Sequence, residues 1–357
     1  MSKTYGQDKL SAIEAMYEAQ KIAFAPIMFQ AAKALRDFGI LDLVLKSLKT
    51  GITIDEIAEK TKISNYGVQV LLEAGLSMNL VYVENDRYKI TKTGYFMISD
   101  ELTKVNMDFT NDVNYKGMFY LQDSIKEGKP VGLHKVFGNW NTVYEALAEM
   151  PEQFRKSWFG FDHYYSDFAF PELMKIIFAG NPHKILDVGG NTGKFSIKCA
   201  EHNSDIKITI LDLPGQLADA YKNIEKKGFS DRIDGYAINL LDDTKEFPKD
   251  ADIIWMSQFL DCFSEEQILS LLRRSYNAMD NNAELFILET YWDKQKFPAS
   301  TYSLHATSLY FTNIANGNSR MYHSEDMIKL VEQSNLYVAE IVENIGVSHT
   351  LFKCKKK

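Results

Sequence analysis

The stretch that decides the fold is "KILDVGGNTGKFS", residues 184–196. An apolar run ends in Asp187, and glycines follow at Gly189, Gly190 and Gly193. A glycine loop between a strand-like run and a helix-like run lets the backbone approach a small ligand closely. The stretch therefore predicts a ligand-binding loop at the end of a strand.

Short apolar runs and helix-like runs alternate from this stretch to the end of the chain. The expected strands are "KILDVGG", "IKITILDL", "IDGYAIN", "ADIIWMSQ" and "AELFILET". One of the helices between them opens with a capping box, Ser264 and Gln267. The pattern predicts an α/β fold, with a parallel sheet covered by helices on both faces. The closing runs "YVAEIVENIG" and "SHTLFKCK" predict a terminal hairpin.

The residues of the loop favour a cationic nucleoside as its ligand. A dinucleotide fingerprint needs glycine where Val188 stands, and a phosphate loop needs Ser or Thr where Phe195 stands. Asp187 places a carboxylate at the entrance of the pocket, where it repels a diphosphate and suits an ammonium or sulfonium group. Asp212, in "ILDLPG", ends the next strand, where an acid accepts both hydroxyls of a ribose. S-adenosylmethionine has both features.

Residues 8–50 predict helices, with a break or kink at Pro26. Residues 101–175 are rich in aromatic side chains and mostly helical in pattern. The composition sets the wider limits. The net charge of −8 argues against a nucleic-acid partner, and the charged first residues lack the apolar core of a secretion signal. Apolar runs are too short to span a membrane, so we expect a cytoplasmic protein.

Residues 53–98 predict a winged helix. Thr53 and Glu56 form a capping box, Ser64 starts a second helix, and "LVYVENDRYKIT" predicts a hairpin that turns at Asn85-Asp86. The second helix, "NYGVQVLLEAGLSMN", holds no Lys or Arg, whereas a DNA-recognition helix presents such side chains to the phosphates. A packing or dimerisation role is therefore favoured over a ligand-sensing or DNA-binding regulator, which is the alternative of another class.

The motifs "LDVGGNTG", "ILDLPG" and "SQFLDCFSEEQ", preceded by a winged helix, resemble the class I S-adenosylmethionine-dependent O-methyltransferases of the caffeate and hydroxyindole type. The resemblance covers nearly the whole chain, in order. It implies a Rossmann-like seven-stranded sheet and a homodimer in which the N-terminal domain helps to close the partner's pocket. The expected domains are a winged-helix dimerisation domain (1–105), a helical linker and substrate-pocket segment (106–175) and a cofactor domain (176–357).

The resemblance also implies the cofactor-binding residues. The first strand and its loop hold the methionine end, the second strand end holds the ribose and the adenine edge, and the third and fourth strand ends complete the pocket. The residues concerned are Asp187, Gly189, Gly190, Gly193, Asp212, Leu213, Asn239, Leu240, Ser257 and Gln258. At the third strand Asn239 stands where the family carries an acid, and Asp242 is a competing alignment.

The catalytic motif departs from the family. The catalytic base of the family is a His within a stretch like L-H-D-W-S-D-E. In this chain the stretch is "LDCFSEEQ", which has Asp261 at the His position. Of the acids that orient the His, one matches Glu289 and the other is replaced by Ser319. Asp261 is one candidate base if burial raises its pKa, and His305 in "TYSLHATSLYFTN" is another. Asp261 is equally explained as an acid at a helix N-terminus.

The implied acceptor is a small, aromatic metabolite, and O-methylation is favoured. The candidate substrate-binding residues are Tyr115, Phe119, Trp158, His163 and Tyr302, although core packing explains most aromatic residues of this region. Methylation of a carbon ortho to a phenol and a non-methylating S-adenosylmethionine-binding activity are the alternatives. The scattered Cys199, Cys262 and Cys354 predict neither a disulfide framework nor a zinc cluster, and no metal is expected.

Overall fold

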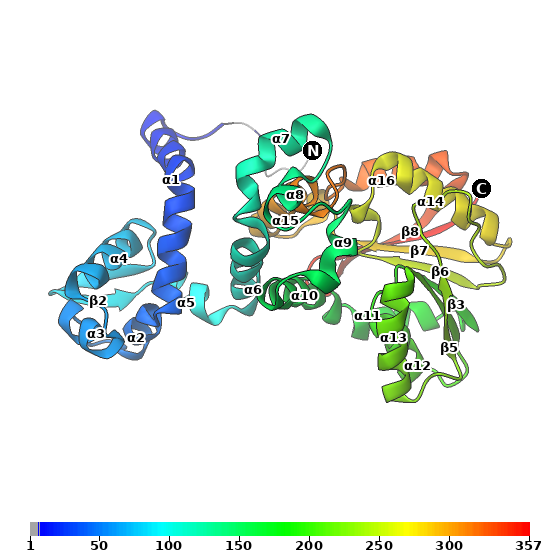
Figure 1. The fold of residues 1–357 in the computed structure, drawn as a ribbon, viewed down its shortest axis with the longest axis horizontal. Helices are drawn as coiled ribbons and strands as arrows, with labels where there is room; N and C mark the ends of the chain where they lie inside the picture. Colours follow the sequence, from blue (N-terminus) through cyan, green and yellow to red (C-terminus); the bar gives the residue numbers. More distant parts are fainter. Residues whose placement is uncertain (1–5, 7) are drawn as a thin grey trace. The chain divides into compact units, whose positions relative to one another are not determined.

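The computed structural model describes residue 6 and residues 8–357, without the side chains of residues 165–167. The chain divides into two compact units, whose sequence boundary lies between Asp112 and Val113. Figure 1 labels their helices and strands. The three-part division at residues 105 and 175 stays a prediction.

The N-terminal unit is a helical domain with one hairpin. Its elements are α1 (Ala12–Asp37), α2 (Ile40–Lys46), α3 (Ile54–Thr61), α4 (Asn65–Ser77), β1 (Val81–Glu84), β2 (Arg87–Ile90), α5 (Lys92–Ser99) and α6 (Glu101–Phe109). The predicted capping box of α3 and the Ser64 cap of α4 are confirmed. The hairpin is also confirmed, because β1 pairs antiparallel with β2. Asn85 and Asp86 at its turn have φ values of 51° and 58°, which Asn and Asp tolerate.

The predicted break at Pro26 is wrong, because α1 continues through this residue, while the alternative of a kink stays a prediction. Proline lacks the N–H that would donate to the Ile22 carbonyl, but both residues are exposed, so water can bind that carbonyl. The helix ends instead before Gly39, which adopts a left-handed φ of 71° and turns the chain into α2. The first helix therefore ends at the glycine that adopts a left-handed conformation, and not at the proline.

The C-terminal unit holds the large sheet and most of the helices. Its helical elements after η2 (Thr110–Asn114) are η3 (Gly117–Tyr120), α7 (Leu121–Glu127), α8 (Val131–Val136), α9 (Val143–Ala146), η4 (Leu147–Glu149), α10 (Glu152–Asp167), α11 (Phe170–Phe178), α12 (Lys194–His202), α13 (Pro214–Lys227), η5 (Leu260–Cys262), α14 (Glu265–Ala278), η6 (Trp292–Lys294), α15 (Pro298–Tyr310), η7 (Phe311–Ala315) and α16 (Ser324–Gln333). The capping box predicted for α14 is confirmed.

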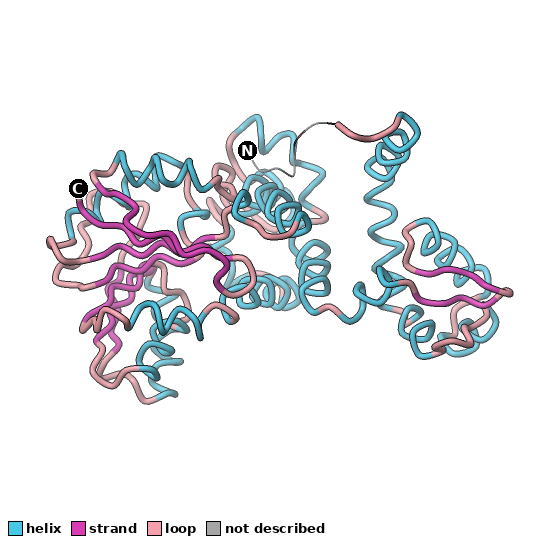
Figure 2. The backbone as a smooth tube through the Cα atoms, turned by 180° about the vertical axis from the view of Figure 1, so that it is seen from behind, coloured by secondary structure: helices cyan, strands magenta, loops and turns pink. Residues whose placement is uncertain are grey.

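The sheet has seven strands in the order β5-β4-β3-β6-β7-β9-β8. They are β3 (Lys184–Val188), β4 (Lys207–Asp212), β5 (Ile233–Ala237), β6 (Ile253–Ser257), β7 (Glu284–Glu289), β8 (Leu336–Ile345) and β9 (His349–Lys356). Neighbouring strands from β5 to β7 are parallel, and β9 runs antiparallel to both β7 and β8. The predicted parallel sheet and the terminal hairpin are therefore confirmed, and the strand order switches between β3 and β6. Figure 2 shows the strands of this sheet in magenta.

Helices cover both faces of this sheet. Residues of α14 and α16 form one buried cluster with one sheet face, and residues of α11, α12 and α13 form a second cluster with the other face (Figure 1). Trp255 of β6 lies in the second cluster and stacks on Phe195 of α12 at 4.4 Å between ring centroids. These two cores fix the carboxyl ends of the parallel strands, where ligands bind in sheets of this class.

Candidate functional site

The glycine loop forms a cradle that side chains would fill. Gly189 follows β3 with a left-handed φ of 74°, and a Cβ atom there would stand 2.4 Å from the ring of Phe259. A Cβ on Gly190 would stand 2.7 Å from the Asp187 carboxylate. The loop is held by the Gly189 N–H, which donates to the Leu211 carbonyl of β4 at 2.8 Å. Glycine is therefore required where the backbone lines the site.

Asp187 lies beneath the loop and not at its entrance, which differs from the sequence prediction. Its side chain is 2% exposed, and Oδ2 accepts a hydrogen bond of 2.6 Å from the Ser196 hydroxyl in the first turn of α12. Burial raises the pKa of Asp187 to about 7, the Ser196 bond opposes that rise and the charge of Asp212 adds to it. The carboxylate has no water shell, so a nearby cation would interact with it strongly.

Asp212 ends β4 and is preorganised by the backbone. Its Oδ1 accepts the Leu213 N–H at 2.7 Å and its Oδ2 accepts the Asn191 N–H at 2.8 Å. Burial raises the pKa of the Asp212 carboxyl above its ordinary value, and these two hydrogen bonds oppose part of that rise. Each carboxylate oxygen has two acceptor positions, so both retain one for a vicinal diol.

The third strand end carries Asn239 and Leu240 in one tight turn. Asn239 is exposed, and its Oδ1 accepts the Leu241 N–H at 3.0 Å, while Leu240 is buried in the core. The Asp242 N–H donates to the Asn239 carbonyl at 3.0 Å, so the two competing candidates occupy the same turn. Their assignment to the cofactor stays a prediction.

Ser257 and Gln258 follow at the end of β6, and both are half-buried. Gln258 has a left-handed φ of 46°, and its N–H donates to the Leu288 carbonyl of β7 at 2.9 Å. This turn directs the chain from β6 toward η5. Both residues therefore lie at the same sheet edge as Asp187.

The glycine loop and the two carboxylates at this end of the sheet suit a cationic nucleoside. The glycine cradle admits a ligand against the backbone, and Asp212 offers acceptors for a ribose diol. Among the described residues, no Lys or Arg side chain is hydrogen-bonded to Asp187 or Asp212, so their charge is available to a cationic ligand. The two carboxylates also repel one another, and a positive charge between strand ends relieves that repulsion.

Asp261 lies in η5, directly after β6, and is 7% exposed. The pKa of Asp261 is raised to about 7, chiefly by burial and in part by the charge of Asp162 on α10. The Cys262 thiol, which donates to Oδ1 at 3.4 Å, opposes this rise. An aspartate with such a pKa is a much stronger base than one in water. Burial in the folded chain therefore gives Asp261 the raised pKa that a base at this position needs.

Glu289, the last residue of β7, holds the backbone of the same segment. Its Oε1 accepts the N–H groups of Phe259 at 3.0 Å and Leu260 at 2.8 Å, and the residue is 2% exposed. Burial, followed by the charge of Asp261, raises the pKa of Glu289 well above its ordinary range. In this chain Glu289 therefore fixes the turn that carries Asp261.

Asn316 and Tyr322 hold the other end of that turn. The Asn316 amide donates to the Cys262 carbonyl at 2.6 Å and to the Ser319 hydroxyl at 2.8 Å. The Tyr322 hydroxyl donates to the Phe263 carbonyl at 2.6 Å. The Ser319 hydroxyl, at a position where the resemblance implies an acid, thus supports Asn316. The sequence did not single out Asn316 or Tyr322, and their only signal was that each lies three residues from Ser319.

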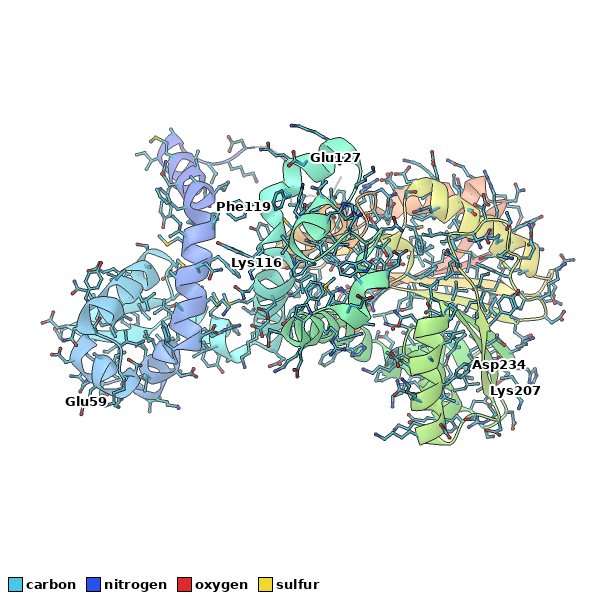
Figure 3. The ribbon with its side chains drawn as sticks, viewed as in Figure 1. Glu59, Lys116, Phe119, Glu127, Lys207 and Asp234 are labelled. Carbon is cyan, nitrogen blue, oxygen red and sulfur yellow. The ribbon has the colours of Figure 1, made fainter. Side chains whose placement is uncertain are left out.

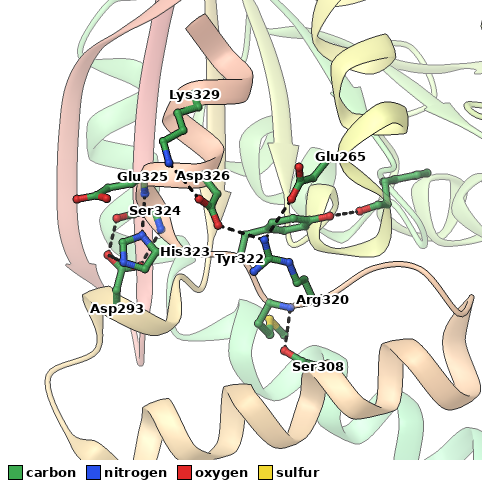
Figure 4. A network of polar contacts seen from close by, with 12 residues as sticks. Glu265, Asp293, Ser308, Arg320, Tyr322, His323, Ser324, Glu325, Asp326 and Lys329 are labelled. Carbon is green, nitrogen blue, oxygen red and sulfur yellow. Dashed lines mark hydrogen bonds and ion pairs between the residues drawn. The ribbon is translucent and has the colours of Figure 1, made fainter. Parts of the chain in front are cut away.

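Figure 4 shows how the segment around Tyr322 is anchored. Arg320 pairs with Glu265 at the start of α14 and with Asp326 on α16, both at 3.1 Å. The Met321 N–H donates to Ser308 Oγ of α15 at 3.1 Å. Three helices therefore fix the position from which Tyr322 reaches the turn.

An aromatic wall stands beside Asp261. The Trp158 indole N–H donates to the Tyr310 hydroxyl at 2.7 Å, and Trp158 packs edge-on against Tyr144 with 6.4 Å between ring centroids. The charge of Asp261 acts on both tyrosines, and burial raises the pKa of Tyr144 and of Tyr310 well above the usual range. Trp158 was predicted from the sequence, whereas Tyr144 and Tyr310 were missed because packing aromatics share the same pattern.

The remaining predicted residues lie elsewhere on this unit. His305 is exposed on α15, and its ring lies 5.0 Å from that of Trp292. Tyr302 is 76% exposed and Phe119, labelled in Figure 3, is 85% exposed. Tyr115 and His163 are half-buried, and the His163 ring lies 4.0 Å from the Asp162 carboxylate. Their roles stay predictions.

Within residue 6 and residues 8–357, no group of three or more His, Cys, Asp or Glu side chains is arranged to hold a metal ion. In the same part of the chain, no helix combines the length and apolarity needed to cross a membrane.

Two family descriptions match the sequence. Residues 17–88 match the Dimerisation2-like domain, and residues 118–334 match the O-methyltransferase domain. The second match covers more than half of the chain and includes both strand-end acids, the glycine loop and the Asp261 turn.

Known proteins resemble the chain along most of its length. It is 26% identical to L-tyrosine C(3)-methyltransferase of Streptomyces lavendulae over 75% of this chain and 73% of that protein. It is 23% identical to caffeic acid 3-O-methyltransferase of Medicago sativa over 77% of each. Among solved structures, the S-adenosylmethionine-dependent methyltransferase SibL superposes with a TM-score of 0.72 at 20% identity, covering 95% of this chain and 98% of that one.

Proposed function

This chain belongs to the O-methyltransferase domain family, and from that premise we propose that it methylates a small phenolic acceptor with Asp261 as the proton acceptor. The methyltransferase fold and the S-adenosylmethionine cofactor predicted from the sequence are confirmed. The observation that carries the proposal is the buried Asp261 at the family's His position, with its pKa raised to about 7.

S-adenosylmethionine supplies an electrophilic methyl group on a positively charged sulfur. Asp212 accepts the ribose hydroxyls, the glycine loop lies along the methionine end, and the buried charge of Asp187 favours the cation. Asp261 takes the phenolic proton, because a carboxylate of pKa about 7 is closer to a phenol of pKa ~10 than an exposed aspartate is. Trp158 and Tyr310 exclude water beside it.

Labelled S-adenosylmethionine and a set of phenols test this function. We expect methyl transfer to at least one phenol, and loss of that transfer in Asp261→Asn with His305→Ala unaffected. Absence of S-adenosylmethionine uptake by the wild type in calorimetry would refute the function itself. Slow turnover in His305→Ala with normal turnover in Asp261→Asn would instead identify His305 as the base.

A ring carbon ortho to the phenol is the second candidate acceptor. The relative from Streptomyces lavendulae is named for methylation at carbon 3 of tyrosine, and the same acceptor phenolate can react at oxygen or at carbon. We favour oxygen, because O-methylation requires only the loss of the phenolic proton, whereas methylation of a ring carbon also requires that carbon to lose its proton in a second step. NMR of the product decides, since an aryl ether methyl and a ring methyl have distinct carbon shifts.

We further propose that the N-terminal unit forms a homodimer. The apolar side chains Ile13, Met16, Phe24 and Ile27 lie on one face of α1 by their spacing and are between 51% and 76% exposed, and residues 17–88 match the Dimerisation2-like domain. A helix with such a face is stabilised by burying it against a second copy. Light scattering should give twice the chain mass, and Phe24→Lys with Ile27→Lys should give the monomer. A monomeric wild type would contradict the dimer.

A cytoplasmic location and the absence of a nucleic-acid partner complete the proposal. The net charge of −8 and the lack of Lys and Arg on α4 support it. A gel-shift assay with genomic fragments at moderate salt should show no complex. A retarded band that disappears with added salt would favour the regulator.

A further inference from the structure

A buried arginine holds the loop that follows β5. Arg274 of α14 is 4% exposed, and its guanidinium donates to the backbone carbonyls of Leu240, of Asp242 at 3.2 Å and of Lys245 at 3.3 Å. The guanidinium also lies over the Phe247 ring, 4.9 Å from the centroid. One side chain therefore binds three carbonyls of a loop that is irregular and mostly exposed.

The loop between β5 and β6 has no helix or strand of its own, so its few backbone hydrogen bonds matter. Two tight turns shape it: the Asp242 N–H donates to the Asn239 carbonyl at 3.0 Å, and the Lys245 N–H donates to the Asp242 carbonyl at 3.2 Å. The hydrogen bond to the Leu240 carbonyl is buried, where a carbonyl needs a donor from the protein, and Arg274 supplies that donor. The planar guanidinium, with five N–H donors, is suited to several acceptors at once.

The same loop begins at the ribose site. The Ile238 N–H donates to the Asp212 carbonyl at 3.0 Å, and Asn239 and Leu240 follow directly. A shift of the loop would therefore move the predicted adenine-side residues relative to the Asp212 carboxylate. It would not touch the Asp261 turn, which is held by Glu289, Asn316 and Tyr322.

We propose that Arg274 is a positioning residue for cofactor binding, because it fixes the loop 239–245 against α14 and thereby the adenine side of the S-adenosylmethionine site. This inference rests on the proposed function. It assigns no contact between Arg274 and the cofactor. It predicts a defect in the affinity for S-adenosylmethionine that is separate from the chemical step.

The test compares Arg274→Met with Arg273→Met, since Arg273 is the exposed neighbour on the same helix. We expect the Kd for S-adenosylmethionine and for S-adenosylhomocysteine to rise about ten-fold in Arg274→Met, which corresponds to ~1.4 kcal/mol. The kcat at saturating S-adenosylmethionine should stay within about two-fold of the wild type. Arg273→Met should match the wild type, and Arg274→Lys, which keeps a donor, should recover part of the affinity.

The possible outcomes separate the inference from the function on which it rests. A folded Arg274→Met with wild-type affinity overturns the inference, and so does a variant in which kcat falls while the Kd does not change. If Arg274→Met does not fold, Arg274→Lys decides, because unchanged Kd values there contradict positioning. Failure of the wild type to bind S-adenosylmethionine refutes the proposed function instead.

Discussion

The two edges of the candidate site satisfy their polar groups in different ways. At the cofactor edge, formed by Asp187, the glycine loop and Asp212, the carboxylates accept bonds from residues 1, 9 and 21 positions away in the sequence. At the acceptor edge, the turn 259–263, the bonds come from residues 29 to 59 positions away. The first edge is a local motif, whereas the second is assembled by the tertiary fold.

This difference explains where the family pattern is kept and where it is replaced. The glycine loop tolerates few changes, because Gly189 and Gly190 have no room for a Cβ atom. The turn 259–263 tolerates a new side chain, because Glu289 and Asn316 bind its backbone N–H and C=O groups. These bonds do not depend on which side chain the turn carries. Asp261 can therefore occupy the His position without loss of the turn.

The largest effect is expected at the acceptor edge from Asp261→Asn. Removal of a general base should lower kcat by about 10²–10⁴-fold. The wild-type kcat should rise with pH and level off above about pH 7, because Asp261 must lose its proton, with a pKa of about 7, before it accepts another. Rate measurements between pH 5 and 9, with S-adenosylmethionine binding as the control, test this. A flat pH profile would show that another group is titrating or that no base is needed.

The next largest effect is expected at the cofactor edge from Gly189→Ala. The substitution forces a side chain into a left-handed conformation and against the Phe259 ring, so we expect the Kd for S-adenosylmethionine to rise by about 100-fold. Calorimetry measures it, with circular dichroism to confirm folding. Gly215→Ala is the control, because a Cβ there meets no atom within 4 Å. Equal affinities in both variants would show that the loop does not line the ligand.

Asn316→Ala tests whether the distant anchors position Asp261. Loss of the bond to the Cys262 carbonyl should let water reach the carboxylate, so the pKa of Asp261 should fall toward ~3.9 and the acid limb of the rate profile should move to lower pH. We expect kcat to drop about ten-fold as well. Asn318→Ala, an exposed neighbour, should leave the limb in place. A lower rate with an unmoved limb would indicate a general structural role.

The smallest effect concerns the stability of the cofactor edge without ligand. The folded pKa of Asp187, about 7, lies above its unfolded value of ~3.9, so its contribution to stability is greatest below pH ~4 and is lost as pH rises through about 7. Asp187→Asn should therefore raise the Tm at pH 8 by ~2–4 °C and change it less at pH 5. Exposed Asp231→Asn is the control. A lower Tm at pH 8 would mean that the charge is compensated in the folded state.

The sequence by itself determined the α/β sheet, the helix caps and hairpin of the N-terminal unit, and the glycine loop at the end of β3, while the assignment of this loop to the cofactor stays a prediction. These depend on period, caps and glycine spacing, which act between residues close in the chain, as the Ser264 and Thr53 capping boxes show. The path of α1 through Pro26 was decided by its solvent-exposed face, which local propensity does not reveal.

Only the tertiary structure decided how the acceptor edge is built. The side chains of Asn316, Tyr322 and Arg274 donate to backbone carbonyls. Every residue has a backbone carbonyl, so the sequence does not reveal which distant side chain will bind it. The raised pKa of Asp261 likewise follows from burial beside Asp162, a residue 99 positions earlier. Burial and long-range pairing are properties of the packed molecule, and they convert an ordinary aspartate into a candidate base.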